Sequence, residues 1–380
     1  MSFDYLILAD GKPARDLVEL AASVTVEQSL DDSARFTIRL EVDLGSDGQY
    51  TLLMDDRVRP GAEISILVRD GESTICLVQG PVDRARVHIA RGGAGSWLEV
   101  MGGDRRVVMD RLHRTAVWPG LDSKIVRTIV ESYGLDPDIT DTEHSSDAQS
   151  HTQNQSATDL AWVQRLARRN GFHFWLSYEV DLGLFATTVK EIAHFKPSPP
   201  RPELSSGPGG GLLDLLPGGG PPRLEINLAG RDTETMASID IEVDAERPTQ
   251  IDGVRVAEAD TLSETTNIPA PPHEPLGALT LKDLTPGVER SMFLTTAGDA
   301  AELRTRANAA LAEAEWFVRA TARCSRYALQ GRVLQPHMVV PVVGLGERYS
   351  GDYFVTSVTH TIDANVHTMD VELARNALGA

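Results

Sequence analysis

The chain has 380 residues, enough for two or three domains with their own cores, and its hydrophobic content of 41% is ordinary for a folded protein. The formal net charge of −19 argues against a surface that grips nucleic acid or anionic lipid, because phosphate binding requires clustered Lys and Arg. The N-terminus carries an acid, Asp4, and no basic leader, and no apolar run approaches the ~20 residues that span a bilayer. We therefore expect cytoplasmic synthesis, no membrane insertion and no specific nucleic-acid binding.

Alternation of apolar and polar residues dominates the first third of the chain. The pattern over residues 24–42, interrupted by turn residues at 30–33, predicts a hairpin. Further alternating runs at 64–68, 75–77, 87–89 and 98–100 are separated by turns rich in Gly, Pro and Asp. The apolar positions of these runs are Val24, Val26, Phe36, Ile38, Leu40, Val42, Ile64, Ile66, Val68, Ile75, Leu77, Val87, Ile89, Leu98 and Val100. They predict an antiparallel sheet or small barrel over residues 1–103.

The pattern changes to helical spacing after residue 104. Residues 121–133 predict a helix with Asp122 or Ser123 as its cap and Gly134 as its stop. Residues 141–155 are polar and without periodicity, which predicts a surface loop.

A second helix and a strand follow at residues 156–176. Ser156 and Asp159 have the spacing of a capping motif, and Gly171 is suited to the left-handed conformation that ends a helix. One face of this helix is apolar, and the next residues alternate as in a strand; the positions are Leu160, Val163, Leu166, Ala167, Phe172, Phe174 and Leu176. Residues 104–195 thus predict an α/β insertion.

Residues 196–222 are dense in Pro and Gly, which cannot hold a regular ladder. This segment predicts a linker or long loop. The four leucines at 212–216 inside it either dock on a neighbouring domain or subunit or belong to a loop that folds back.

Residues 223–380 return to β patterning. Alternation over 224–256 predicts further strands, residues 260–288 form a polar, Pro-rich connection, and residues 300–320 have helical spacing. Pro336 is expected to start a strand and residues 350–352 to launch another; apolar or small residues share one face in each, namely Met338, Val340 and Val342, then Tyr353, Val355, Ser357 and Thr359. Gly344 and Gly346 supply the turn between them.

Two stretches carry a resemblance to a known family. Ser-x-x-Asp-Leu at 156–160, Arg-Leu-Ala at 165–167 and Asn-Gly-Phe-x-Phe-Trp at 170–175 resemble the helix-to-strand signature of the baseplate hub family. That family includes the late control protein D of contractile phage tails and the N-terminal half of VgrG proteins. Residues 329–363 resemble a second signature, which ends in Val-Thr-Ser-Val-Thr-His, although the usual Pro-Gly is here Pro336-His337.

The resemblance implies two β-barrel domains separated by a helix-containing domain. The sequence contains a matching internal echo, because Pro60 and the alternation through Ile64 and Ile66 repeat the layout of Pro336 and the alternation that follows it. In the family, two barrels of similar plan in each of three chains present six similar surfaces, which join a sixfold tube to a threefold spike.

An enzyme is the competing class of function. His360 and Asp363, with His337 and His367, could supply a general base or a metal cluster. No Cys-x-x-Cys, His-Glu-x-x-His, Gly-x-Ser-x-Gly or P-loop spacing accompanies them. A histidine in Val-Thr-His-Thr is more often a half-exposed residue of a sheet.

The remaining acids and thiols favour structural roles. Asp31-Asp32 and Asp55-Asp56 are interpreted as turn acids rather than a glycosidase pair. Cys76 and Cys324 lie in apolar, strand-like surroundings and are interpreted as small buried side chains.

We therefore predict a mainly β protein with an α/β insertion: a first barrel over 1–103, the insertion over 104–195, a Pro/Gly-rich linker over 196–222, and a second barrel over 223–380 with a helix at about 300–320. The expected function is that of a structural, non-enzymatic baseplate hub subunit of a contractile phage tail or injection system. The expected partners are two further copies, a separately encoded spike, tube or initiator proteins and other baseplate proteins. No catalytic, cofactor-binding or metal-binding residue is assigned. The alternatives are a tube initiator or adaptor that forms sixfold rings, or a cell-wall hydrolase.

Overall fold

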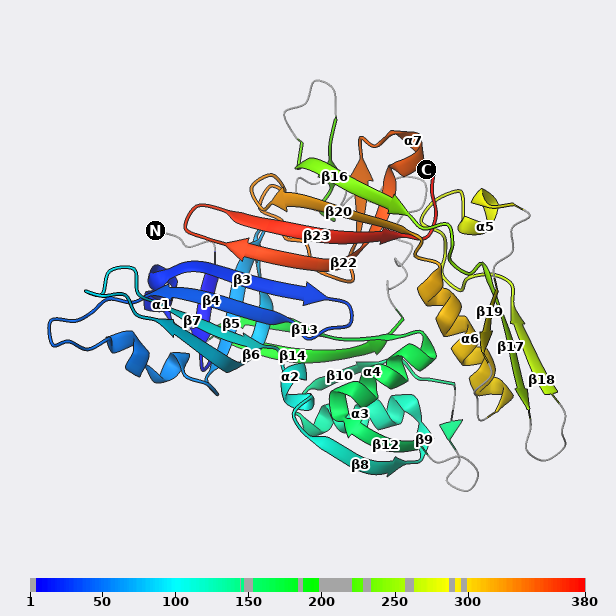
Figure 1. Cartoon of the computed structure of the whole chain (residues 1–380), viewed down its shortest axis with the longest axis horizontal. Helices are drawn as coiled ribbons and strands as arrows, with labels where there is room; N and C mark the ends of the chain where they lie inside the picture. The colour runs from blue at the N-terminus through cyan, green and yellow to red at the C-terminus, as the bar shows by residue number, and fades with distance from the viewer. Residues whose placement is uncertain are drawn as a thin grey trace.

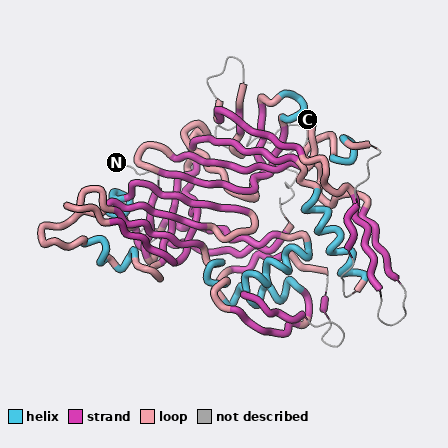
Figure 2. The backbone as a smooth tube through the Cα atoms, in the orientation of Figure 1, coloured by secondary structure: helices cyan, strands magenta, loops and turns pink. Residues whose placement is uncertain are grey.

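The computed structural model describes residues 5–143, 145–146, 153–183, 187–197, 221–227, 234–256, 263–286, 291–294 and 299–379. One large sheet crosses the molecule, with a helix-containing lobe on one side and a strand-and-helix layer on another (Figure 1). Strands account for most of the regular structure, and the longer helices lie in these two peripheral parts (Figure 2).

The elements fall into three consecutive groups. The first contains β1 (Tyr5–Ala9), β2 (Lys12–Pro13), α1 (Arg15–Leu20), β3 (Ala21–Ser29), β4 (Arg35–Glu41), two short 3-10 turns (Thr51–Met54 and Asp56–Val58), β5 (Glu63–Asp70), β6 (Ser73–His88) and β7 (Trp97–Gly103). The second contains α2 (Arg106–Met109), β8 (His113–Trp118), β9 (Gly120–Leu121), α3 (Asp122–Ser132), β10 (Asp136–Ile139), β11 (Ser145–Ser146), β12 (Gln153–Thr158), α4 (Asp159–Asn170), β13 (His173–Leu182) and β14 (Thr187–Lys196). The third contains β15 (Leu224–Glu225), β16 (Met236–Val243), β17 (Gln250–Val256), β18 (Ser263–Ile268), α5 (Leu281–Leu284), β19 (Ser291–Leu294), α6 (Ala300–Ala314), β20 (Val318–Ser325), β21 (Val339–Val343), α7 (Gly346–Tyr349), β22 (Gly351–Ile362) and β23 (His367–Arg375).

The large sheet has 13 strands and joins the first and third groups. Its order is β16-β20-β23-β22-β3-β4-β7-β6-β5-β1-β2, with β21 paired to β22 and β15 paired to β21. The junction is the antiparallel pair β22·β3, in which Thr359 lies opposite Glu27. Smaller sheets are β10-β14-β13 and β18-β17-β19, and β8·β12 and β9·β11 form two-stranded ladders.

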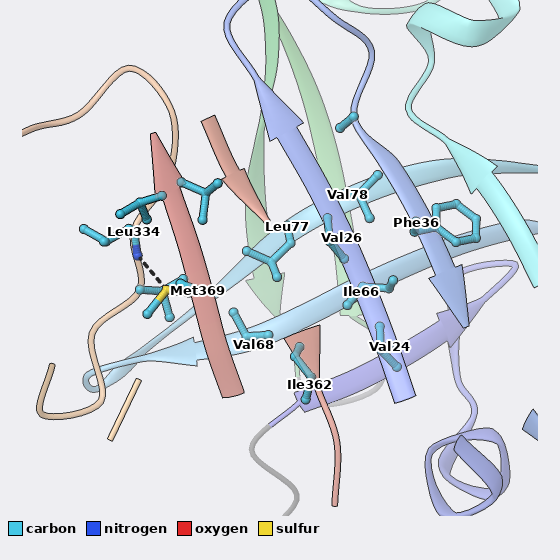
Figure 3. Close-up of a cluster of buried hydrophobic side chains, with 14 of the residues drawn as sticks. Val24, Val26, Phe36, Ile66, Val68, Leu77, Val78, Leu334, Ile362 and Met369 are labelled. Carbon is cyan, nitrogen blue, oxygen red and sulfur yellow. Dashed lines mark hydrogen bonds between the residues drawn. The ribbon is translucent and has the colours of Figure 1, made fainter. Parts of the chain in front are cut away.

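The core under this sheet is continuous across the two halves of the chain. Val24 and Val26 of β3 and Ile66 of β5 pack in one cluster with Ile362 of β22 and Met369 of β23 (Figure 3). All five side chains are at most 3% exposed. Because one cluster draws on both halves, burial of apolar surface stabilises the two halves jointly rather than as separate cores.

The predicted mainly β class with a helix-containing insertion is confirmed. The two expected barrels take a different form, because no strand pairing in the described part of the chain closes either half into a barrel. Instead, β22 of one half pairs with β3 of the other and continues the same sheet. The domain boundaries at 103, 195 and 222 remain predictions.

The second helix of the insertion begins later than predicted. Ser156 belongs to β12, where it lies opposite Thr115, and the cap of α4 is Thr158, whose hydroxyl accepts from the Ala161 N–H at 3.2 Å. The predicted stop is confirmed, because Gly171 has φ 68°. The predicted apolar face is also buried; it consists of Leu160, Val163, Leu166 and Ala167, joined by Trp162.

The predicted N-cap residues of α3 are wrong, because the Asp122 carboxylate accepts hydrogen bonds from other elements instead of capping the helix. The N-cap is Leu121, and the helix already includes Asp122 and Ser123. The fully buried Asp122 carboxylate accepts from Gln153 Nε2 at 2.8 Å and from Asn170 Nδ2 at 2.7 Å. It therefore ties the start of α3 to β12 and to the end of α4.

Several segments predicted as connections contain regular structure. Part of the polar stretch 141–155 forms β12, where Gln155 is fully buried and its side chain accepts from the Trp118 indole N–H at 2.8 Å. The stretch 260–288 contains β18 and α5. Residues 212–216, the leucines of the predicted linker, lie outside the described residues.

The C-terminal third departs from prediction in two places. The helix predicted at 300–320 ends at Ala314, and Val318 already starts β20. Likewise, β21 starts at Val339, after Pro336. In β22 the register shifts between Val355 and Ser357, so Ser357 does not share the buried face of Val355 as predicted. A bulge of this kind inserts one extra residue and reverses which side chains point to the core.

The Ser-Gly-x-Tyr part of the second signature forms a cradle for a buried arginine. Arg375 is 0% exposed and donates to the carbonyls of Leu276 (2.7 Å), Ser350 (2.9 Å) and Gly379 (2.6 Å). Its guanidinium lies 5.4 Å from the centre of the Tyr353 ring. Gly351 has φ 137°, and a Cβ there would collide with the guanidinium, so glycine is required on both counts.

Among the described residues, no helix is both long enough and apolar enough to cross a membrane.

Candidate assembly surface

The histidines singled out in the sequence occupy two separate places. His360 and His367 are buried neighbours, with His360 Nδ1 at 3.1 Å from His367 Nε2 and His360 Nε2 at 3.1 Å from Gln28 Oε1. His337 lies elsewhere and stacks on Trp175 at 3.8 Å between ring centres. Asp363 accepts from the backbone N–H groups of a turn, including that of Val366 at 2.9 Å. Within the described residues, no group of three or more His, Cys, Asp and Glu is arranged to hold a metal ion.

Burial lowers the pKa of His194, His337 and His360. Below the ordinary histidine pKa near 6.5, the unfolded chain binds protons that the folded chain does not, so the free energy of unfolding falls as the pH decreases. We expect a lower urea midpoint at about pH 5.5 than at about pH 7.5. His360→Gln should reduce this difference, whereas His113→Gln, at an exposed position, should not. If the His360→Gln variant kept the same difference in urea midpoint between the two pH values, His360 would not contribute to the pH dependence of stability.

The structure also brings together three hydrogen-bonded polar side chains, Ser177, His194 and Asp138, which the sequence did not indicate. Ser177 Oγ lies 2.6 Å from His194 Nε2, and His194 Nδ1 lies 2.8 Å from Asp138 Oδ2. The residues come from β13, β14 and β10, and no short motif links them. Serine, histidine and aspartate in this order occur in hydrolases. Here Ser177 lies within a regular strand rather than on an exposing turn, so we interpret these hydrogen bonds as a link between the three strands.

The acid pairs have structural partners in the described residues. Asp31 Oδ1 lies 3.0 Å from His173 Nδ1, which holds the pKa of Asp31 below its usual range. Asp55 caps a 3-10 turn and accepts from the Arg57 backbone N–H at 2.9 Å. The prediction that these acids belong to turns and loops is confirmed for both positions.

The two cysteines are buried free thiols, as predicted. Burial raises the pKa of Cys76 and raises that of Cys324 to about 12. Because the thiolate is the reactive form, both thiols are unreactive at neutral pH.

The eight consecutive strands of the large sheet from β16 to β6 consist of one plan used twice. The orders β3-β4-β7-β6 and β16-β20-β23-β22 are the same arrangement, and every neighbouring pair is antiparallel. In chain order, the strands β3 to β7 correspond to β16, β20, β21, β22 and β23. The first half continues into the second through the pair β22·β3.

The pairing registers of the two halves coincide residue by residue. Arg39 lies opposite Glu99 in the first half, and Arg323 lies opposite Asp370 in the second. Both pairs are in ionic contact, at 3.8 Å and 2.9 Å. The surrounding sequences, Arg-Phe-Thr-Ile-Arg at 35–39 and Arg-Ala-Thr-Ala-Arg at 319–323, follow the same pattern.

The β-bulges and the strands that flank them also occupy equivalent positions in the two halves. The register shifts between Val82 and Arg84 in β6 and between Val355 and Ser357 in β22. In addition, the pair Glu63↔Pro81 of β5·β6 matches the pair Val339↔Phe354 of β21·β22. The echo between Pro60 and Pro336 in the sequence therefore corresponds to equivalent strands in the structure.

Among the residues that the structure describes, two strand edges are left without a neighbouring strand at the ends of this eight-stranded arc. We call β16 the acidic edge, because Asp240 and Glu242 are exposed on it. We call residues 83–88 of β6 the basic edge, because β5 pairs with β6 only up to Val82 and the exposed residues beyond it include Arg84, Arg86 and His88. The upper edge of the sheet in Figure 1 is β16. Exposed edges present unpaired backbone N–H and C=O groups to another strand.

One face of the arc carries charged side chains across most of its strands. It carries charged side chains on the strands β3, β4, β7, β20 and β23, namely Glu27, Arg35, Arg39, Glu99, Arg319, Arg323, Asp370 and Glu372. The alternate residues face the core. Arginines lie beside acids across this face, as in the contact of Arg86 with Glu99 at 3.7 Å. The charges of this face are therefore mixed, although the chain as a whole is strongly acidic.

No family model matches the sequence, and no curated protein matches it. Solved structures do match. A tail protein from Neisseria meningitidis superimposes with a TM-score of 0.63 at 13% identity, over 99% of this chain and 98% of the other. A 43 kDa tail protein of prophage MuSo2 from Shewanella oneidensis gives a TM-score of 0.62 at 12% identity, over 99% of both chains.

The chain has the phage tail protein fold. The mainly β fold with a helix-containing insertion, expected from the resemblance to baseplate hub proteins, is thus confirmed, although the two halves form one sheet rather than two closed barrels. An Escherichia coli component of the type VI secretion system, described as similar to the T4 tail proteins gp27 and gp5, shares this fold with a TM-score of 0.53 at 11% identity. That match covers 93% of this chain and 73% of the other. At such low sequence identities, the structural superpositions establish the fold alone. The role of this chain has to be argued from its own residues.

Proposed function

We propose that the chain is a structural baseplate hub subunit of a contractile phage tail or contractile injection system. It acts as a homotrimer that joins the tail tube to a separately encoded spike. Tube or initiator proteins bind one side of the ring, the spike binds the other, and further baseplate proteins surround it. The particle is assembled in the bacterial cytoplasm.

The observation that carries this proposal is the doubled four-stranded plan within one chain. Three chains supply six such units, so a ring with threefold symmetry offers six similar surfaces to a sixfold tube. In the described part of the chain, β16 and residues 83–88 of β6 are exposed edges at the two ends of the arc, and this supports the ring, because exposed edges can pair with strands of neighbouring copies. The polar face of the arc then lines the channel, and its mixed charges neither attract nor repel a charged cargo strongly.

The alternative, a tube initiator or adaptor with sixfold symmetry, needs only one unit of this plan per chain. The present chain has two in a continuous sheet, which favours the hub. The third hypothesis, a cell-wall hydrolase, would need the buried His360 or the hydrogen-bonded Ser177 and His194 as its catalytic groups. Neither supplies the exposed nucleophile that hydrolysis requires.

Electron microscopy of the purified chain, mixed with the spike protein encoded beside it, tests the proposal. We expect face-on views with threefold symmetry and six similar lobes, and side views with the spike on one face. Rings built from six copies would support the initiator alternative. Particles without a ring, with or without the spike, would contradict both assembly proposals.

A further inference from the structure

His337 lies where the second and third groups of elements meet. Its ring stacks on Trp175 of β13, with 3.8 Å between the ring centres and 16° between the planes. Trp175 also stacks on His194 of β14, at 4.7 Å. The strands β13 and β14 lie between the large sheet and the helices α3 and α4 (Figure 1), and β13 contacts both β6 and α4. The stack therefore joins the third group to the strands at the base of the helix-containing lobe.

The backbone at His337 is in an unfavourable conformation for a residue with a side chain. Its φ is 70°, in the left-handed region where a Cβ crowds the following carbonyl. Backbone hydrogen bonds hold it there, from the His337 N–H to the Val355 carbonyl at 3.1 Å and from the Val355 N–H to the Met338 carbonyl at 2.8 Å. A strained residue persists only where the surrounding structure fixes it, and such residues gather at functional places. At His337 the side chain held in this way is the one that reaches Trp175.

The charged and titratable groups around the His337 ring disfavour a positive charge on it. His173 of β13 approaches edge-on, with 6.0 Å between the ring centres. Arg106 of α2 is 3% exposed and lines the same small cavity as His337. Burial, and then the charges of His173, Arg106 and His194, hold the pKa of His337 well below its ordinary value.

The other titratable groups of this region do not offset that charge. Three acids are bound to neighbours of His337: Asp104 to Arg106 at 2.7 Å, Asp31 to His173 at 3.0 Å, and Asp138 to His194 at 2.8 Å. Cys76 and Tyr178 line the cavity, of about 120 Å³, and burial raises the pKa of both, so they are neutral near pH ~7. Attraction between an imidazolium and the Trp175 ring offsets only part of the cost of a buried charge, because desolvation is the larger effect.

We propose that the stack of His337 on Trp175 is an acid-sensitive latch between the second and third groups. While His337 is neutral, residues 335–338 are closed against β13. Protonation moves the His337 ring into water, and residues 335–338 separate from β13 while the large sheet stays paired. The opening is local, because α4 against α6 and Val180 against the cluster around Leu67 are contacts without histidine. The latch lies within one chain and is independent of the trimer proposed above.

Linkage between protonation and opening sets the size of the effect. In the open state His337 has the ordinary histidine pKa of about 6.5, whereas in the closed state its pKa is lowered. The closed state is therefore fully stable above pH ~6.5 and loses stability as the pH falls below that value. Between about pH 7.5 and about pH 5.5 the ratio of open to closed molecules is expected to rise about tenfold.

The thiol of Cys76 reports the opening. Cys76 is 2% exposed and lines the cavity that residues 335–337 also line, whereas Cys324 on β20 is 4% exposed and does not line it. Both thiols are labelled with a pyridyl disulfide, which also reacts in acid, and the two rates are measured by mass spectrometry. Global unfolding and the pH dependence of the reagent act on both thiols, so the ratio of the Cys76 rate to the Cys324 rate isolates the latch. We expect this ratio to rise about tenfold from about pH 7.5 to about pH 5.5.

Variants at position 337 separate the charge from the stack. His337→Phe keeps an aromatic ring that cannot be protonated, so the labelling ratio should stay low at both pH values. His337→Gly removes the ring and the backbone strain, so the ratio should be high at both. His360→Gln, at a buried histidine outside the latch, is the matched control and should respond to acid as the wild type does. Thermal melts check that each variant is folded.

Three results would each overturn the latch. A wild-type labelling ratio that does not change with pH would show that the contact stays closed in acid. An acid response of His337→Phe equal to that of the wild type would assign the response to another group. A low ratio for His337→Gly at both pH values would show that the stack does not hold residues 335–338 in place.

Discussion

Arg375→Met is expected to lower the free energy of unfolding by about 3 kcal/mol or more, the largest loss for any single side chain discussed above. The guanidinium is fully buried and serves the carbonyls of Leu276, Ser350 and Gly379. Methionine fills a similar volume but donates no hydrogen bond, so three partly buried carbonyls lose their donor. Each unsatisfied buried group costs about 1–3 kcal/mol. Urea denaturation monitored by tryptophan fluorescence measures the loss.

Arg323→Met is the matched control for this variant. Arg323 is also an arginine at a strand of the large sheet, but it is exposed and its partner is the half-buried Asp370. Exposed ion pairs contribute little, so its urea midpoint should stay close to that of the wild type. Equal midpoints for the wild type and Arg375→Met would contradict the cradle formed by the Ser-Gly-x-Tyr signature.

Gly171→Val is expected to produce the second large loss, because two costs add. The residue has φ 68°, a conformation that costs a side-chain-bearing residue about 1 kcal/mol or more. A Cβ at this position would also lie 3.2 Å from Ala309 Cα, on the helix α6 that packs against α4. Overpacking against a backbone costs a further ~1–3 kcal/mol.

Gly134→Val separates the two costs. Gly134 ends α3 with φ 73°, and no atom lies within 4 Å of where its Cβ would stand. Its urea midpoint should fall by the backbone cost alone, and so by less than that of Gly171→Val. Equal losses in the two variants would show that the contact between α4 and α6 does not depend on glycine at position 171.

Local periodicity predicted most of the elements but not their partners. The alternation at Val24, Val26, Phe36 and Ile38 predicted a hairpin, and the structure contains this hairpin as β3 and β4. It could not reveal that β3 would pair with β22, more than 300 residues later in the chain, because strand pairing depends on sequence-distant contacts. For this reason the sequence predicted two barrels where the structure has one continuous sheet.

The errors in the sequence reading share a physical cause. Ser156 has ordinary capping spacing, but the backbone of β12 extends past it to pair with β8, so the cap moves to Thr158. At Val355, one extra residue in a bulge changes the parity of the strand, which no alternating pattern records.

The mass of the purified wild-type chain in solution, measured by light scattering behind a sizing column, tests the central claim most directly. A homotrimer of the 41.3 kDa chain has a mass of about 124 kDa, and we expect this value for the chain alone. With the spike protein added, we expect the mass of the trimer plus that of the bound spike. A mass corresponding to six copies would contradict the threefold hub and support an initiator ring. A mass of one copy at every concentration, with or without the spike, would contradict assembly through the two edges altogether.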